Sequence, residues 1–156
     1  MKRYMRIYAD TSVFGGVFDD AFALSSRILF EQVRENRFEL ISSALVVDEL
    51  AAAPEKVRNY FLSFADLMQV KDIPREAVQL RDAYLEAGIV GTASLADAQH
   101  VALATVFDCW AIVSWNFRHI VHAQKIPFYN GVNQGQGYKA IAIHTPQEVI
   151  RYEEKI

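Results

Sequence analysis

Short apolar segments alternate with longer segments of helical character along almost the whole chain, and this alternation constrains the fold more than any other feature. Strands that are separated by helices form mainly parallel sheets whose faces the helices cover. We therefore expect an α/β fold, a three-layer sandwich with a mainly parallel central sheet flanked by helices. The expected strands lie at residues 4–9, 38–41, 67–70, 110–114 and 139–143.

The segments between these strands contain apolar stripes and residues that favour a helix start. Asp19 or Asp20 is available to cap a helix over 21–35, and Ser94 to cap one over 95–106. No linker, repeat or low-complexity tract divides the chain, so we expect a single domain over residues 1–156. The other expected helices occupy about 43–52, 54–66 and 74–88, with a last short helix from Pro146.

The composition is that of an ordinary folded domain. Hydrophobic residues make up 52% and charged residues 22% of the chain, which excludes a mainly disordered protein. The net charge of -3 excludes the strongly basic class of nucleic-acid binders, although an enzyme can still meet nucleic acid through a bound cation. The one cysteine, Cys109, cannot form an internal disulfide, and it fits a reducing cytoplasm.

Membrane attachment and secretion are not expected. No segment reaches the roughly 18 apolar residues of a membrane span. The basic start at residues 1–3 is followed by a short apolar stretch at 4–9 and then Asp10, which is too short for a signal peptide. We therefore expect a cytoplasmic protein with no membrane partner.

The residues directly after the strands are the first place to look for a site. In open parallel sheets, ligands bind beyond the carboxyl ends of the strands, where the strand order reverses. Asp10 and Ser12 follow the first strand, and Asn116 follows the strand at 110–114. Asp10 is therefore either a carboxylate held in this crevice or a residue that only caps a turn.

Two further acids lie on expected helices. Glu49 follows Leu45 and Val46 on one helix face, where a carboxylate either needs a partner or reaches to solvent. Asp97 lies three residues after Ser94, a spacing that is also typical of a structural capping box. Each acid alone therefore has a structural explanation as well as a functional one.

Three carboxylates from distant parts of the chain, Asp10, Glu49 and Asp97, suit a hard cation. Mg²⁺ or Mn²⁺ binds oxygen ligands and keeps several waters. Because clustered carboxylates repel one another, we expect raised pKa values in the absence of metal. A zinc site is excluded, because His119 and His122 are the one short-spaced pair of suitable residues.

Residues 109–147 contain no Asp or Glu. Basic groups contact phosphates and aromatic rings stack on bases, which is what single-stranded nucleic acid requires. The alternative is that Trp110 and Phe117 belong to the core. The stretch holds three basic residues, three histidines and six aromatic residues, namely Arg118, Lys125 and Lys139, then His119, His122 and His144, then Trp110, Trp115, Phe117, Phe128, Tyr129 and Tyr138.

Four short motifs resemble those of the PIN-domain nucleases, and their order and spacing match that family over almost the whole chain. They are residues 7–12 (IYADTS), 47–50 (VDEL), 95–104 (LADAQHVALA) and 112–119 (IVSWNFRH). The resemblance implies a parallel sheet flanked by helices and metal-dependent cleavage of RNA, and many small members are VapC-type toxins of toxin–antitoxin pairs. The family's acidic positions fall on Asp10, Glu49 and Asp97, and its polar position falls on Ser12.

The chain departs from this family at Asn116, where many members have a further aspartate. An amide oxygen can bind a metal-held water but adds no charge, so we expect one tightly held metal rather than two. The loop expected at 129–138 is longer than a minimal toxin needs and has no assigned role.

We therefore expect a Mg²⁺- or Mn²⁺-dependent endoribonuclease that cleaves single-stranded RNA. Arg118 is expected to contact a phosphate oxygen. The expected metal ligands are Asp10, Glu49 and Asp97, and the side chains expected to position the metal's waters are Ser12 and Asn116.

Two alternatives remain open at this point. A non-catalytic PIN-like module would bind RNA or a protein with an impaired metal site, a reading that Asn116 favours. A phosphohydrolase would act on small phosphate esters instead of RNA. The resemblance also implies an antitoxin partner, and the hydrophobic content together with the prevalence of two-fold pairs predicts a homodimer.

Overall fold

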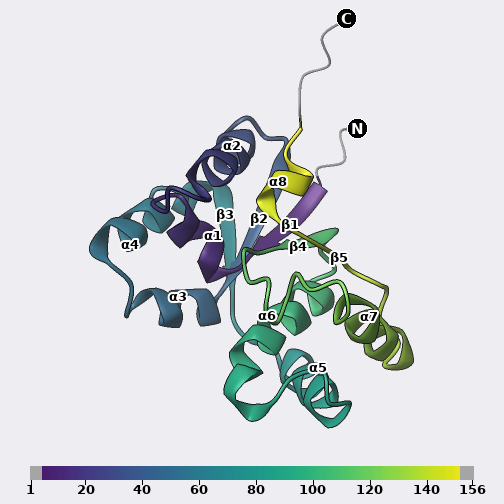
Figure 1. Cartoon of the computed structure of the whole chain (residues 1–156). Coiled ribbons are helices and arrows are strands. Elements are labelled where there is room, and N and C mark those ends of the chain that lie inside the picture. The colour runs from purple at the N-terminus through teal and green to yellow at the C-terminus, as the bar shows by residue number, and fades with distance from the viewer. Residues whose placement is uncertain (1–4, 152–156) are drawn as a thin grey trace, which may run out of the picture.

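A parallel sheet forms the centre of the computed structural model, which describes residues 5–151 (Figure 1). Within these residues the sheet has five strands in the order β3-β2-β1-β4-β5, and every neighbouring pair is parallel. The strands are β1 (Met5–Ala9), β2 (Phe38–Ser43), β3 (Met68–Lys71), β4 (Ala111–Val113) and β5 (Ala142–His144). The expected mainly parallel sheet is confirmed, whereas Tyr4 of the first expected strand lies outside the described residues.

Helices cover both faces of the sheet, which confirms the three-layer sandwich (Figure 1). The chain runs outward from β1 to β3 and then returns to β4 on the other side of β1. Because crossovers between parallel strands are right-handed, this reversal places the later helices on the opposite face. One face carries α1 (Thr11–Gly16), α2 (Ala23–Arg34), α3 (Ala44–Leu50), α4 (Glu55–Leu62) and α8 (Pro146–Val149); the other carries α5 (Arg75–Glu86), α6 (Leu95–Val106) and α7 (Ile126–Gly135).

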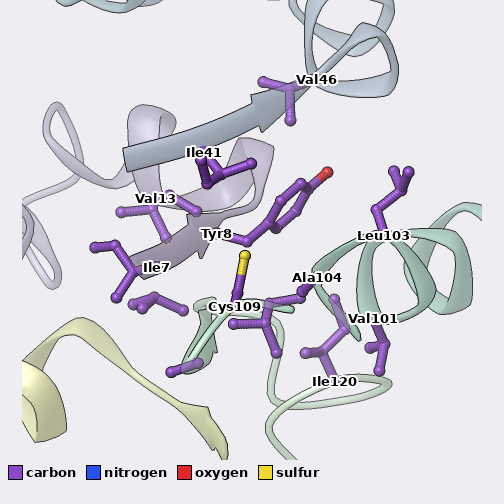
Figure 2. Packing of buried hydrophobic residues seen from close by; sticks show 14 of the residues in the cluster. Ile7, Tyr8, Val13, Ile41, Val46, Val101, Leu103, Ala104, Cys109 and Ile120 are labelled. Atoms are coloured by element: carbon purple, nitrogen blue, oxygen red, sulfur yellow. The ribbon is translucent and has the colours of Figure 1, made fainter. Parts of the chain in front are cut away.

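The hydrophobic core surrounds the central strand β1. Ile7, Tyr8 and Ala9 are completely buried, because β1 has a strand on each side and a helical layer on each face. Helix α6 is buried over the continuous run 98–105, and its small alanines let it lie close to the sheet. Figure 2 shows this packing around Tyr8. Residues at the carboxyl end of β1 and the start of α6 are therefore held on rigid elements.

Helix α1 was not expected, since the segment after the first strand has the composition of a turn. Its six residues directly follow Asp10, and Val13 and Phe14 are buried under the sheet. Asp19 does not cap the next helix as predicted. Its carboxylate accepts from the backbone N–H of Ala21 at 3.0 Å and holds the turn that precedes α2.

The segment 129–138 was expected as a loop, and this prediction is wrong. Most of it belongs to α7, which begins with Pro127 in its first turn. Two residues four positions apart, Tyr129 and Asn133, are completely buried on the inner side of the helix. The glycines and asparagines of this segment concealed that pattern, because both residue types favour turns.

The last strand also begins later than predicted, at Ala142 instead of residue 139. Asn130 of α7 explains this, because its side chain bonds both the N–H and the C=O of Ile141, at 2.8 and 3.0 Å. The segment before the strand is thereby tied to α7 and not to the sheet. None of the helices within residues 5–151 is long and apolar enough to cross a membrane.

Candidate active site

Asp10 lies where the strand order reverses, at the carboxyl end of β1. Its backbone N–H donates to the C=O of Val113 at the end of β4, at 3.2 Å, so the two strand ends are joined at this residue. It stands at the N-cap position of α1, and its side chain makes no capping bond there. The residue is only 4% exposed. The alternative that Asp10 merely caps a turn therefore does not hold.

Two serine hydroxyls hold the carboxylate of Asp10. Ser12 Oγ donates to Oδ1 at 2.5 Å, and Ser114 Oγ donates to Oδ2 at 2.6 Å. The same hydroxyls accept backbone N–H groups, Ser12 from Trp115 and Ser114 from Asn116, both at 2.9 Å. Burial raises the pKa of Asp10, and the opposing effects of His100 and the serines only partly offset it. The carboxylate of Asp10 is thus held in a fixed position, and its ionised form is destabilised by burial.

Glu49 is half-buried on α3 and uses one oxygen for two hydrogen bonds. Thr11 Oγ1 donates to Oε1 at 2.7 Å, and His100 Nε2 lies 2.5 Å from the same atom. Burial alone would raise the pKa of Glu49, but the hydrogen bonds from His100 and Thr11 outweigh it and lower that pKa. The neighbouring Asp48 is exposed, as the helix pitch predicts. Glu49 is therefore the carboxylate of this group that most readily carries its charge.

Asp97 is half-buried in the first turn of α6. The alternative capping box is not formed, because Ser94 makes no side-chain capping bond and ends a short 3₁₀ turn instead. Burial raises the pKa of Asp97, and the charge of Glu49 acts in the same direction. The histidines His119 and His100, and a hydrogen bond from the side chain of Asn116, partly oppose this rise.

The three predicted acids lie at one edge of the sheet and interact electrostatically. Glu49 raises the pKa of both Asp10 and Asp97. Within residues 5–151, however, no three acidic, histidine or cysteine side chains are arranged closely enough to hold a metal ion between them. The donor set fits Mg²⁺ or Mn²⁺, which one or two carboxylates hold together with waters and substrate phosphate.

Asn116 has a structural duty that the sequence did not reveal. Its Oδ1 accepts the backbone N–H groups of Arg118 at 3.2 Å and His119 at 3.0 Å. Since both acceptor positions of this oxygen are used, it is the NH₂ end of the amide that remains for Asp97. Arg118 itself is exposed and leaves its guanidinium available at the rim of the site.

Four residues of the site were not predicted as members of it: Thr11, Ser114, Tyr8 and His100. A signal for Ser114 was present, because it follows Val113, the residue that pairs with Ala9 in the register of β1 and β4. His100 was visible one helical turn after Asp97, but a lone histidine at such a position usually packs without a further role. Thr11 and Tyr8 gave no signal of their own.

An aromatic group borders the site. Trp115 stacks on Phe22 with ring centroids 4.3 Å apart, and its indole N–H donates to Ser26 Oγ at 2.8 Å. Phe117 lies 6.2 Å from both rings and is 50% exposed. The alternative that Phe117 belongs to the core is therefore wrong, and the ring is accessible beside Trp115.

A cavity among the described residues lies at the opposite edge of the sheet. It encloses about 1000 Å³ between Arg6, Glu39, Cys109 and Lys139, which stand at the amino ends of the strands. It also adjoins Arg151, at the limit of the described chain. The cavity therefore contributes nothing to the carboxylate group described above.

Sequence comparison finds no match, whereas structural comparison finds chains with a similar fold. No model of a known protein family matches the sequence, and no curated protein matches it significantly. A chain of FitAcB from Neisseria gonorrhoeae superposes with a TM-score of 0.57 and 13% identity over 92% of this chain and 99% of its own. VapC20 from Mycobacterium tuberculosis, a sarcin-ricin loop cleaving toxin, superposes with a TM-score of 0.52 and 13% identity, over 87% of this chain and 98% of its own.

A third similar structure is a chain of VapBC2 from Rickettsia felis, solved in complex with a DNA fragment from its promoter. It superposes with a TM-score of 0.55 and 16% identity over 73% of this chain and 90% of its own. At such low identity these matches concern the path of the chain and not its chemistry. The protein therefore has the PIN-domain fold of the VapC-type toxins, as its four sequence motifs indicate.

Proposed function

We propose that the protein is a metal-dependent endoribonuclease that cleaves single-stranded RNA. The observation that carries the proposal is the electrostatic coupling of Glu49 to both Asp10 and Asp97 at the carboxyl edge of the sheet, where the strand order reverses. The fold supports it, since VapC20, which shares that fold, is described as a toxin that cleaves the sarcin-ricin loop.

The residues at this edge have different roles in the proposed reaction. Asp10, Glu49 and Asp97 are the groups that would hold Mg²⁺ or Mn²⁺, and the bound cation supplies an activated water and neutralises charge on the phosphate. Ser12 orients the Asp10 carboxylate through its 2.5 Å hydrogen bond. Asn116 donates toward Asp97 and, by accepting two N–H groups, shapes the turn that presents Arg118.

A single-stranded RNA substrate suits the rim of the site. Phe117 offers an exposed ring for base stacking, and Arg118 offers an exposed guanidinium for a phosphate. Both belong to the acid-free segment 109–147, so no carboxylate of that segment repels the RNA backbone. Cys109 takes no part, because burial raises the pKa of its thiol to about 12.

The cellular role that we propose is that of a cytoplasmic toxin controlled by an antitoxin. The similar structures include toxin–antitoxin complexes, one of them from Klebsiella pneumoniae. An amphipathic antitoxin helix in an apolar groove is the expected mode of binding. We also propose a two-fold homodimer, and light scattering that finds only a 17.7 kDa species at all concentrations would reject it.

A non-catalytic RNA- or protein-binding module is the second candidate. Two observations favour it, namely the amide at Asn116 and the lack of an enclosed three-residue metal site within residues 5–151. Such a protein would bind RNA at the same rim but would leave it intact.

Cleavage assays separate these candidates. The purified protein is incubated with single-stranded RNA, and separately with a mononucleotide phosphate ester, in Mn²⁺ or in EDTA. We expect RNA cleavage that requires Mn²⁺ and is lost in Glu49→Gln but retained in Asp48→Asn, the exposed neighbour on the same helix. Intact RNA at saturating Mn²⁺ supports the binding module, and hydrolysis of the mononucleotide alone supports a small-ester phosphohydrolase.

A further inference from the structure

Both ring nitrogens of His100 are hydrogen-bonded in the interior of the protein. The side chain is almost completely buried, with Nε2 2.5 Å from Glu49 Oε1 and Nδ1 2.7 Å from the Tyr8 hydroxyl. That hydroxyl also lies 2.8 Å from Ser43 Oγ. Figure 2 shows the Tyr8 ring within the hydrophobic cluster, among side chains from β2 and α6. A chain of hydrogen bonds thus connects the core to a carboxylate of the candidate site.

The direction of these hydrogen bonds follows from counting donors. Ser43 Oγ accepts the N–H of Val46, so its own proton needs another acceptor, which among the described residues is the Tyr8 hydroxyl. Tyr8 then donates to Nδ1 of His100. The ring proton of His100 is therefore on Nε2, which donates to Glu49 Oε1. In this arrangement each donor of the hydrogen-bonded series Ser43–Tyr8–His100–Glu49 has an acceptor.

We propose that His100 is a positioning residue, which holds Glu49 Oε1 against α6 and leaves Oε2 free for the cation. This inference rests on the proposed function. Thr11 donates to the same Oε1 atom from α1, at 2.7 Å, so two donors on different helices select one orientation of a side chain that is otherwise half-exposed. His100 is only 2% exposed, so it acts through Glu49 and not by touching RNA.

Ser43 gives the arrangement its rigidity. It is the N-cap residue of α3, the helix that carries Glu49, and its hydroxyl also ends the hydrogen-bond chain that begins at that carboxylate. A rotation of α3 would disturb both contacts at once. The orientation of Glu49 is therefore coupled to the buried Tyr8 and not to solvent.

The test measures metal binding in the absence of RNA. A calorimetric Mn²⁺ titration compares the wild type with His100→Leu, which removes both hydrogen bonds, and His100→Gln, whose side-chain amide can still donate to Glu49. We expect His100→Leu to weaken Mn²⁺ binding by about 10–100-fold and His100→Gln to restore most of the affinity. Tyr8→Phe should weaken binding in the wild type but add nothing in His100→Leu, because Tyr8 acts through His100.

A second readout does not depend on the Leu variant folding. ¹⁵N NMR of the wild-type imidazole should show Nε2 protonated and Nδ1 unprotonated, and Tyr8→Phe should reduce this difference. A proton on Nδ1, or equal Mn²⁺ affinity in wild type and His100→Leu, would overturn the inference alone. A wild-type protein that binds no Mn²⁺ would overturn the proposed function and this inference together.

Discussion

At the scale of single residues, the three carboxyl groups differ in how easily they ionise in the folded protein. Burial raises the pKa of Asp10 and of Asp97, whereas hydrogen bonds lower the pKa of Glu49. A carboxyl group with a raised pKa in the folded state binds its proton more readily than the unfolded chain does. Stability therefore falls as the pH rises through that range, and a bound cation relieves this cost.

Replacing Asp10 with asparagine should separate activity from stability. We expect the cleavage rate to fall by about 100-fold or more, because a lost metal ligand removes several kcal/mol of transition-state stabilisation. Without metal, the melting temperature at neutral pH should stay equal or rise. That gain should disappear as the pH falls through the raised pKa of Asp10, since the wild-type carboxyl is then uncharged as well. Full activity of the variant at saturating Mg²⁺ would contradict the assignment.

Replacing Asn116 with aspartate tests the departure from the PIN pattern. The new carboxylate can still accept the N–H groups of Arg118 and His119, but its second oxygen faces Asp97 in place of an NH₂ group. We expect lower stability without metal, tighter binding of a second Mn²⁺ ion and a lower Mn²⁺ demand for half-maximal cleavage. Calorimetry paired with cleavage rates measures this, and an unchanged metal demand would place Asn116 outside the site.

Sequence reasoning found the residues that carry charge and, apart from Ser12, missed the residues that hold them in place. Asp10, Glu49 and Asp97 were recognisable because a carboxylate after a strand or on an apolar helix face needs an explanation. Ser114, Thr11 and similar partners are ordinary polar residues, and only the register of the strands and helices brings them to the carboxylates. The structural role of the Asn116 oxygen was hidden for the same reason.

At the scale of elements, the segment after β4 is fastened to the segment after β1. Ser114 is central to this, because its hydroxyl donates to Asp10 and accepts the backbone N–H of Asn116. The pairing of β1 with β4 places these two strand ends side by side, at the point where the strand order reverses and where open parallel sheets bind ligands. The short helix α1 and the helix α7 escaped prediction, since their glycines and polar residues resemble turns.

Removing the Ser114 hydroxyl should impair cleavage by about 10–100-fold, which is the usual effect of losing a group that orients a metal ligand. Ser114→Ala should also lower the free energy of unfolding by about 1–3 kcal/mol, because the partly buried N–H of Asn116 loses its acceptor and the buried Asp10 carboxylate loses a donor. Ser42→Ala is the matched control, since Ser42 Oγ is buried and has no partner among the described residues. Equal losses in both variants, by chemical denaturation and cleavage assay, would argue against a special role for Ser114.

Two adjacent glycines of α1 test how closely this helix must approach Trp115. A Cβ atom on Gly16 would lie 2.8 Å from both Ser26 Oγ and Trp115 Nε1, whereas one on Gly15 would meet nothing within 4 Å. Gly16→Ala should therefore break the indole hydrogen bond and cost about 1–3 kcal/mol, as overpacked core positions do. Gly15→Ala should be neutral or slightly stabilising, because alanine favours helices. Indistinguishable tryptophan fluorescence and stability in the two variants would refute this close packing.

At the scale of the whole molecule, the fold determines where the candidate site lies, whereas a few side chains determine what chemistry the site can perform. The order β3-β2-β1-β4-β5 brings the ends of β1 and β4 together and directs α3 and α6 toward them from opposite layers. The fold is shared with VapC20 and with chains of toxin–antitoxin and similar complexes at 12–16% identity, so the fold alone does not decide the activity. The central claim is that Asp10, Glu49 and Asp97 form one cation site.

Anomalous diffraction from a crystal soaked in Mn²⁺ tests this claim most directly. We predict an anomalous peak beside the carboxylates of Asp10 and Asp97 and the Oε2 atom of Glu49, at the distances of Mn²⁺–oxygen bonds. The peak should be absent from a crystal of Asp10→Asn soaked in the same way. A wild-type crystal with no peak at these residues, or with Mn²⁺ bound only elsewhere, would contradict the account.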